Sequence, residues 1–173
     1  MGNNGDYYLN NASGDIFRKE SGTWVKIGNL KGPPFTPSTS KIRVYNSSVA
    51  QTLTGTSIVQ IKFSATEFDI LNEFSINPTS SRFIASQSGY YLITVNVGSS
   101  QSAVATLNLY IYKNGIVHSS TYVNEAYPHA TITDIIYLNT NDYIELFGAS
   151  GASKNNPLIL GQDKLWMSIF RIV

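Results

Sequence analysis

Apolar and polar residues alternate along two neighbouring segments in the middle of the chain, from Tyr90 to Val97 and from Ala103 to Tyr112. Because successive side chains of a strand point to opposite sides, each alternation predicts one buried face. The predicted buried faces are Tyr91, Ile93, Val95 and Val97, followed by Ala105, Leu107, Leu109 and Ile111. Gly89 opens the first strand and the turn Asn114-Gly115 closes the second, which favours an antiparallel arrangement.

Further short β-rich segments recur from Lys41 onward at the spacing that is typical of a β-sandwich. They are residues 42–45, 58–63, 82–85, 117–123, 130–138, 143–147 and 165–172. Within one of them, Asp134 is expected to face outward beside Thr133. No helical period of convincing length is present. The pattern therefore predicts an all-β antiparallel jelly-roll sandwich over residues 41–173.

A smaller module precedes this domain, over residues 1–32. Short apolar segments at Tyr7–Leu9, Asp15–Lys19 and Thr23–Ile27 are separated by turn residues, which predicts a three-stranded meander. Such a sheet buries little surface by itself. We therefore expect Tyr8, Phe17 and Trp24 to pack against other copies or against the next domain. Residues 33–40 are rich in Pro and Ser and are predicted to form a linker.

Charged residues make up only 13% of the chain and the formal net charge is +1, so the surface suits uncharged partners. No run of Lys or Arg is present to follow phosphates, which argues against nucleic acid. Cysteine is absent, which excludes disulfides and thiolate metal sites. No segment has the length and apolarity of a membrane span, so membrane insertion is not expected.

The head domain resembles the globular head of complement subcomponent q, within the tumour-necrosis-factor-like superfamily. The resemblance rests on Phe68, Asn72, Phe74, Phe83, the pattern Gly89-x-Tyr91-x-Ile93-x-Val95, Leu109–Gly115 and Leu138–Leu146. It implies a ten-stranded jelly roll that assembles as a homotrimer with the last strand near the threefold axis. Asn141-Asp142 stands where the family often has Gly-Asp, and Asn tolerates the left-handed turn conformation.

The first module resembles the short modules beside collagen-like repeats in bacteriophage tail fibres and bacterial surface proteins. The resemblance rests on Gly5–Leu9, Gly14–Phe17 and Gly22–Gly32. Gly32-Pro33-Pro34 matches one collagen triplet, although no period of three continues. The start Met1-Gly2-Asn3-Asn4-Gly5 indicates a cut upstream of a module, so we expect the chain to be a fragment. The resemblance implies a virion tail fibre, or alternatively a bacterial or spore surface.

Catalytic motifs are missing from the sequence. His118 and His129 lie in no nucleophile elbow and in no metalloprotease helix, so we do not expect an enzyme. Glu67 and Asp69 are the nearest approach to a pair of catalytic carboxylates, and a solvated strand edge explains them better. We predict no cofactor and no metal. Trp24 and Trp166 are expected to be core residues because they lie among alternating apolar neighbours.

Two surfaces are predicted to bind partners. Residues 119–129 are expected to form a long recognition loop, and residues 153–157 a second polar loop, whose mixed aromatic, amide and charged groups suit a sugar. The candidate ligand-binding residues are Tyr122, Asn124, Glu125, Tyr127, His129, Lys154, Asn155 and Asn156. Residues 148–153 are expected to be a flexible loop. The candidate trimer-interface residues are Tyr90, Leu92, Tyr110 and Tyr112, because half-exposed tyrosines are enriched where proteins meet.

The favoured function is a non-enzymatic homotrimeric receptor-binding tip of a bacteriophage tail fibre, which contacts a glycan or protein on the host bacterium. A structural head that only joins three chains of a bacterial collagen-like surface or spore-coat protein is the alternative. A glycan-processing enzyme is the third hypothesis.

Overall fold

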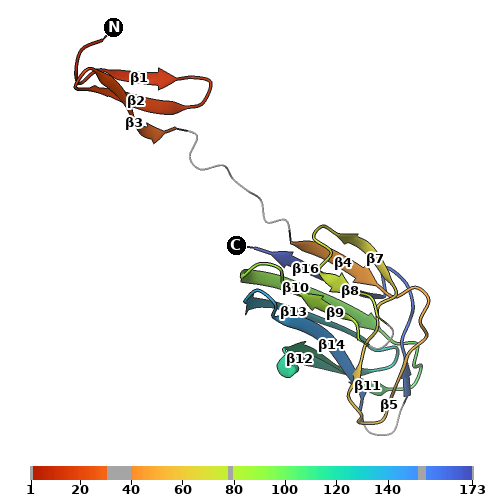
Figure 1. Cartoon of the computed structure of the whole chain (residues 1–173). Coiled ribbons are helices and arrows are strands. Elements are labelled where there is room, and N and C mark those ends of the chain that lie inside the picture. The colour runs from red at the N-terminus through yellow and green to blue at the C-terminus, as the bar shows by residue number, and fades with distance from the viewer. Residues whose placement is uncertain (1, 31–39, 78–79, 152–154, 173) are drawn as a thin grey trace. The chain divides into compact units, whose positions relative to one another are not determined.

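The computed structural model describes residues 2–30, 40–77, 80–151 and 155–172. The chain divides into two compact units, Met1–Pro37 and Ser38–Val173 (Figure 1). The described residues form strands and turns without any helix, as the sequence predicts, and these parts of the chain hold no long apolar helix that could cross a membrane. Apart from Ser40, the predicted linker 33–40 lies outside the described residues.

The first unit is a three-stranded antiparallel sheet in the order β1-β2-β3. Its strands are β1 (Tyr7–Asn10), β2 (Asp15–Glu20) and β3 (Thr23–Asn29), which confirms the predicted meander. Gly14 and Gly22 have φ angles of 77° and 83°, a left-handed conformation that glycine adopts without strain. The two turns therefore sit where the sequence places its glycines.

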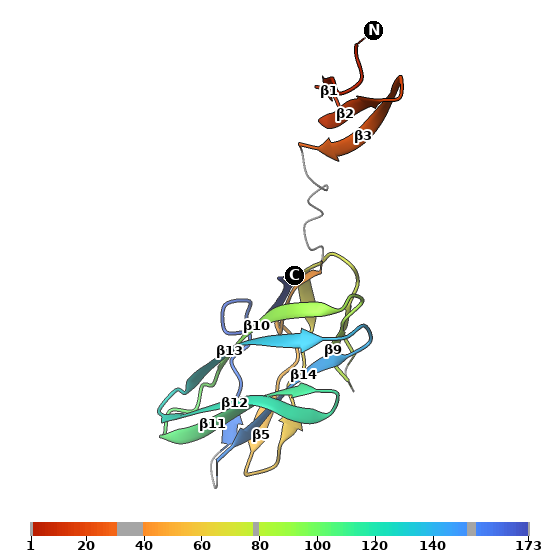
Figure 2. The same cartoon turned by 90° about the vertical axis from the view of Figure 1, so that its left-hand side faces the viewer.

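The second unit, the head, is a sandwich of two antiparallel sheets (Figures 1 and 2). The five-stranded sheet has the order β13 (His129–Leu138), β10 (Gly89–Gly98), β16 (Leu165–Arg171), β4 (Lys41–Tyr45), β7 (Ala65–Asp69). The six-stranded sheet has the order β12 (Ile116–Glu125), β11 (Ala105–Lys113), β14 (Tyr143–Ser150), β9 (Arg82–Ile84), β8 (Phe74–Ser75), with β6 (Val59–Gln60) also paired to β14. A short ribbon of β5 (Thr52–Thr54) and β15 (Asn155–Pro157) completes the head.

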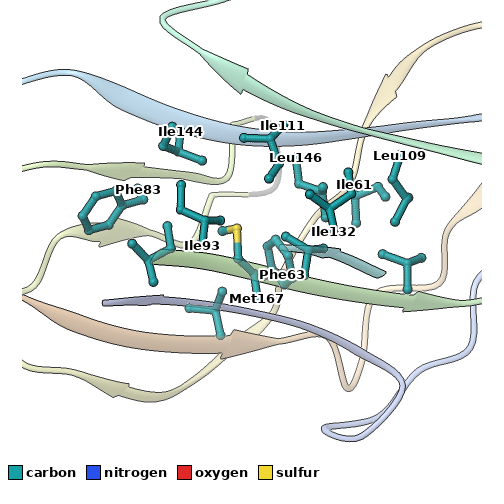
Figure 3. Close-up of a cluster of buried hydrophobic side chains, with 14 of the residues drawn as sticks. Ile61, Phe63, Phe83, Ile93, Leu109, Ile111, Ile132, Ile144, Leu146 and Met167 are labelled. Atoms are coloured by element: carbon teal, nitrogen blue, oxygen red, sulfur yellow. The ribbon is translucent and has the colours of Figure 1, made fainter. Parts of the chain in front are cut away.

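The core lies between the two sheets (Figure 3). The predicted buried faces of β10 and β11 are confirmed, because Tyr91, Ile93, Val95, Val97, Leu107, Leu109 and Ile111 are all fully buried. Met167 and Ile169 of β16 extend the β10 face within its own sheet, and Ile144 and Leu146 of β14 extend the β11 face of the opposite sheet. The all-β jelly-roll prediction is thus confirmed.

Asn141 has a φ of 73°, so it takes the left-handed turn position for which the sequence offers Asn in place of Gly. The adjacent Asp142 joins two turns. Its carboxylate accepts hydrogen bonds from Asn114 Nδ2 at 2.7 Å and Asn139 N at 2.9 Å, and lies 3.0 Å from Lys113 Nζ. These contacts, with the Asn114 bond as the largest influence, lower the pKa of Asp142 to about 2.

Four strands of the head were not predicted from the sequence. β5, β7, β8 and β15 are additional to the predicted strands, and residues 58–63 form a strand only at Val59–Gln60. The predicted flexible loop 148–153 is wrong for its first residues, because β14 continues through Ser150. Gly148 serves close packing there: a Cβ atom on it would lie 2.9 Å from Leu53 Cδ1 and 3.0 Å from Ile61 Cδ1. Residues 152 and 153 lie outside the described part.

The predicted recognition loop 119–129 is also corrected. Residues up to Glu125 belong to β12, which pairs with β11, and β13 begins at His129. Only a turn at residues 126–128 remains, where Tyr127 has a φ of 52°. β12 is an edge strand with many exposed polar residues, so its sequence resembles a loop although its backbone is paired.

Asp134 does not face outward as predicted. It alternates with the buried residues Ile132 and Ile136 on β13, so it lies on the inner side of the sheet. At this edge of the sandwich, Ser119 Oγ donates a hydrogen bond to Asp134 Oδ2, and His118 Nε2 lies 3.8 Å from the same oxygen. These contacts from β12 explain how a carboxylate is tolerated at an inward position.

Candidate functional site

The head has two distinct ends. At one end, Arg171 N donates to Ser40 O at 2.9 Å, so the last strand finishes beside the start of β4. The opposite end, which we call the apical end, contains residues 99–104, the turn at 126–128 and the β5–β15 ribbon (Figure 1). The apical end thus lies away from the point where the chain enters the head.

Gln101 ties the apical segments together. Its backbone oxygen accepts a hydrogen bond from Tyr127 N at 2.6 Å, and its side-chain Nε2 donates to Asn155 O at 2.6 Å. The turn and β15, which are distant in the sequence, are thereby held side by side. Gln101 was not among the predicted site residues, because its only signal in the sequence is its place in a polar segment between two strands.

Ser99 and Asn156 fix β15 to the rest of the head. Asn156 Nδ2 donates to Thr106 O at 2.7 Å and to Ser150 Oγ at 3.1 Å, while Ser99 Oγ donates to Pro157 O at 3.0 Å. Asn156 is fully buried, so it is removed from the candidate ligand-binding residues. It is a structural residue whose amide satisfies buried backbone groups. Lys154 lies outside the described residues.

Tyr127, His129 and Glu125 surround the apical turn. Tyr127 is 58% exposed, and His129 and Glu125 are exposed as well. The imidazole of His129 lies over Gly98: a Cβ atom on Gly98 would lie 2.4 Å from its Cε1. His129 N also donates to Glu125 Oε1 at 3.4 Å. An aromatic ring, an imidazole and a carboxylate are thus exposed within five consecutive residues of one hydrogen-bonded turn.

Tyr122 and Asn124 lie elsewhere, on β12 at the edge of the six-stranded sheet. Tyr122 is 71% exposed and is paired in register with Asn108, while Asn124 is paired with Thr106. The predicted ligand-binding residues therefore fall into two sets. Glu125, Tyr127, His129 and Asn155 belong to the apical end, whereas Tyr122 and Asn124 belong to the outer face of β12.

The outer face of the five-stranded sheet carries an exposed apolar surface, which we call the apolar face. Its residues are Tyr90, Leu92, Ile135, Tyr137, Phe170 and Ile172. Tyr90 and Tyr137 are paired in register with ring centroids 5.1 Å apart, and Leu92 is paired with both Ile135 and Phe170. Tyr90, Ile135, Tyr137 and Ile172 are 47–57% exposed. An apolar surface shared by neighbouring strands is typical of a protein–protein interface.

Tyr110 and Tyr112, the other predicted interface residues, lie on a different sheet. They alternate with the buried Leu109 and Ile111, which places them on the outer face of the six-stranded sheet. Tyr112 packs against Phe147 with ring centroids 4.3 Å apart. Since Tyr90 and Leu92 belong to the five-stranded sheet, the four predicted residues do not form one continuous surface.

A hollow of about 690 Å³ adjoins the apolar face and is lined in part by Arg43, Glu67, Phe68 and Trp166. The Arg43 guanidinium lies 4.2 Å from the centre of the Trp166 ring, and its Nε lies 2.8 Å from Glu67 Oε2. Trp166 is therefore a partly exposed residue that stacks with a cation, and its assignment to the core is wrong. Trp24, at 36% exposed, is also outside a core.

The two carboxylates considered for catalysis have separate structural partners. Glu67 pairs with Arg43, and Asp69 accepts hydrogen bonds from Glu73 N at 2.9 Å and Phe74 N at 2.8 Å. Asp69 therefore fixes a turn and does not face Glu67 across a groove. In the described ranges, no three His, Asp or Glu residues come together as a metal site.

Comparison with known proteins finds solved structures of tumour-necrosis-factor-like jelly rolls that are similar to this chain in fold. No family model matches the sequence, and no curated protein matches it. The crystal structure of murine APRIL at pH 8.0 matches with a TM-score of 0.60 and 10% identity, over 77% of this chain and 98% of that one. Eiger TNF from S. frugiperda matches with a TM-score of 0.59 and 9% identity, over 79% of this chain and 94% of that one. At these identities the likeness concerns the fold, and it confirms the predicted jelly roll.

Proposed function

We propose that this chain forms a non-enzymatic homotrimer and that its jelly-roll heads are the receptor-binding tip of a bacteriophage tail fibre. The partner is a glycan or protein on the surface of the host bacterium. The observation that carries the proposal is the apical end, where Gln101 holds Tyr127 and β15 together beside His129 and Glu125. Recognition residues on loops that a rigid scaffold positions are the usual form of a binding site.

The apolar face supports the trimer. Tyr90, Ile135 and Tyr137 are each about half exposed in the single chain, and neighbouring copies would cover them. The sheet that carries this face also contains β16, the last strand of the head. Closure around a threefold axis leaves the apical ends of all three heads pointing the same way. Three weak sites on one axis then provide avidity without a deep pocket.

The chemistry of the apical end suits a polar, weakly charged ligand. The Tyr127 ring offers a flat apolar surface for a sugar ring, and the imidazole of His129 and the carboxylate of Glu125 offer hydrogen-bonding groups beside it. The low proportion of charged residues in the chain agrees with an uncharged partner. The tail-fibre setting, on a virion and outside the cell, is supported by the resemblance of the first module to tail-fibre modules.

Adsorption of the purified full chain to host bacteria and to a glycan array tests the proposal. We expect Tyr127→Ala to reduce adsorption by about tenfold or more through loss of an aromatic contact, with the fold intact. Tyr122→Ala is the matched control, because it removes a tyrosine that is at least as exposed from a different surface. Intact trimers that adsorb to no bacterial surface would overturn the proposal. That result would favour the structural head of a bacterial collagen-like surface or spore-coat protein.

A further inference from the structure

The small sheet of the first unit has two different faces. Strand alternation and the register of the pairs place Tyr7 and Leu9 of β1, Ile16 of β2, and Val25 and Ile27 of β3 on one side, which we call the aliphatic face. The opposite side carries Tyr8, Phe17 and Trp24. Both faces carry large apolar side chains, although a solvated surface sheet usually has one polar face.

The aliphatic face is exposed. Tyr7 is 66%, Leu9 42%, Val25 41% and Ile27 49% exposed. Within residues 2–30, Gly14 is the only residue that is buried, so this sheet has no core of its own. A sheet that cannot bury an apolar face against a second layer is not stable alone. The face therefore requires a covering partner.

The aromatic face differs because it is partly closed by its own unit. The Tyr8 ring lies 6.0 Å from both Phe17 and Trp24, measured between ring centroids. Lys19 Nζ lies 5.9 Å from the centre of the Trp24 ring and donates a hydrogen bond to Gly2 O at 2.7 Å, which draws the N-terminal segment across this side. Tyr7 and Leu9, on the other side, are in no ring or cation contact of this kind among the described residues.

The charges on the aliphatic face allow copies of it to meet. Its charged residues, Arg18 and Glu20, pair with each other at 3.8 Å between Arg18 NH1 and Glu20 Oε1. Lys26 and Asp15, which pair at 2.6 Å, lie on the aromatic side. The face is thus apolar and electrically balanced, so a second copy can approach without like charges meeting.

We propose that the aliphatic face packs against the same face of the other copies, so that the first units hold three chains together. We call this packing the interchain clasp. This inference rests on the proposed homotrimer. Nine residues separate Leu30 from Ser40, which limits the reach of the tether to about 35 Å. Assembly of the heads would therefore raise the local concentration of the three sheets to the millimolar range. At that concentration, weak packing between small apolar faces is sufficient to hold the three sheets together.

Cysteine cross-linking tests the clasp directly, because the chain contains no natural cysteine. Val25→Cys places a thiol on the aliphatic face, and Lys26→Cys places one on the aromatic side of the same strand. Each full-length variant is treated with a short bis-maleimide and analysed by denaturing gel. We expect several-fold more cross-linked chains for Val25→Cys than for Lys26→Cys, and loss of this excess when Leu9→Glu is added.

Light scattering on the same samples separates the two proposals. If the variants are trimers and Val25→Cys cross-links no better than Lys26→Cys, the clasp is wrong and the homotrimer stands. If the chains have the mass of one subunit, both the homotrimer and the clasp are wrong. The proposal is supported if both variants have the mass of a trimer and Val25→Cys cross-links more than Lys26→Cys.

Discussion

The imidazole of His129 lies directly over the α-carbon of Gly98, its partner in the strand register between β13 and β10. A Cβ atom at position 98 would lie 2.4 Å from His129 Cε1 and 2.8 Å from Nδ1. The absence of a side chain at residue 98 thus determines where the imidazole rests. A core strand in this way positions a candidate ligand-binding group at the apical end.

Gly98→Ala is expected to displace the His129 ring at small cost to stability, about 1 kcal/mol or less, because His129 is exposed and its ring can swing away. Adsorption should fall although the fold persists. In a His129→Ala background the same substitution should have no effect on adsorption. A double-mutant cycle measures this, and equal losses in both backgrounds would show that the two residues are independent.

Asn156→Ala is expected to destabilise the head by about 1–3 kcal/mol, because it removes a buried amide that donates hydrogen bonds to Thr106 O and to Ser150 Oγ. Chemical denaturation measures the change. Asn155→Ala is the matched control, since Asn155 is exposed and contributes its backbone oxygen to the bond with Gln101. Equal stability of the two variants would contradict the structural role of Asn156.

The parts of the fold that the sequence predicted correctly are those with strong alternation. β10 and β11 are central strands with one buried face, so burial imposes a pattern that can be recognised. β5, β8 and β15 have two or three residues each, which is too short for any period to appear. β12 confirms the strand predicted at 117–123, but it is a mostly exposed edge strand, so its second half was also predicted as a loop.

The candidate site was only partly predictable for a related reason. Tyr127, His129 and Asn155 could be selected as polar or aromatic residues near strand ends, but their proximity depends on Gln101, which joins segments distant in the sequence. Asn156 was selected by its chemistry and is buried by a long-range contact with Thr106. Composition indicates which residues are able to bind, whereas strand pairing decides which of them face solvent.

Because of Asp142, the stability of the head is expected to decrease as the pH becomes acidic. Its pKa is about 2 in the folded head, below the ordinary value of 3.8, mainly because Asn114 donates a hydrogen bond to it. As the pH falls, the Asp142 carboxylate therefore binds a proton in the unfolded chain at a higher pH than in the folded head. Its contribution to the free energy of unfolding is complete well above pH 3.8 and is lost as the pH falls toward 2.

The free energy of unfolding of Asp142→Asn should accordingly differ most from that of the natural chain near neutral pH, and the difference should shrink as the pH falls toward 2. Denaturation midpoints at several pH values measure this. Asp163→Asn is the control, because Asp163 lies at an exposed pair with Lys164 and its loss should matter less. A difference that stays constant with pH would contradict the account.

Tyr91→Ala is expected to prevent stable folding by opening a core cavity that costs about 3–5 kcal/mol. The Tyr91 side chain is fully buried, its ring centroid lies 5.5 Å from that of Phe83, and its hydroxyl donates to Gln87 O at 2.6 Å. Tyr91→Phe, which keeps the ring and removes only the hydroxyl, should cost about 1 kcal/mol. Thermal unfolding compares the two, and normal melting of Tyr91→Ala would contradict the assignment to the core.

The central claim is that copies of this chain cover the apolar face of the five-stranded sheet in one another. Light scattering of the full chain at native pH and micromolar concentration tests it most directly. We predict a mass of three chains, and a lower mass for Ile135→Lys, which places a charge at an exposed position of that face. Ser120→Lys, on the other sheet, should remain trimeric. A monodisperse solution of single chains would contradict the account.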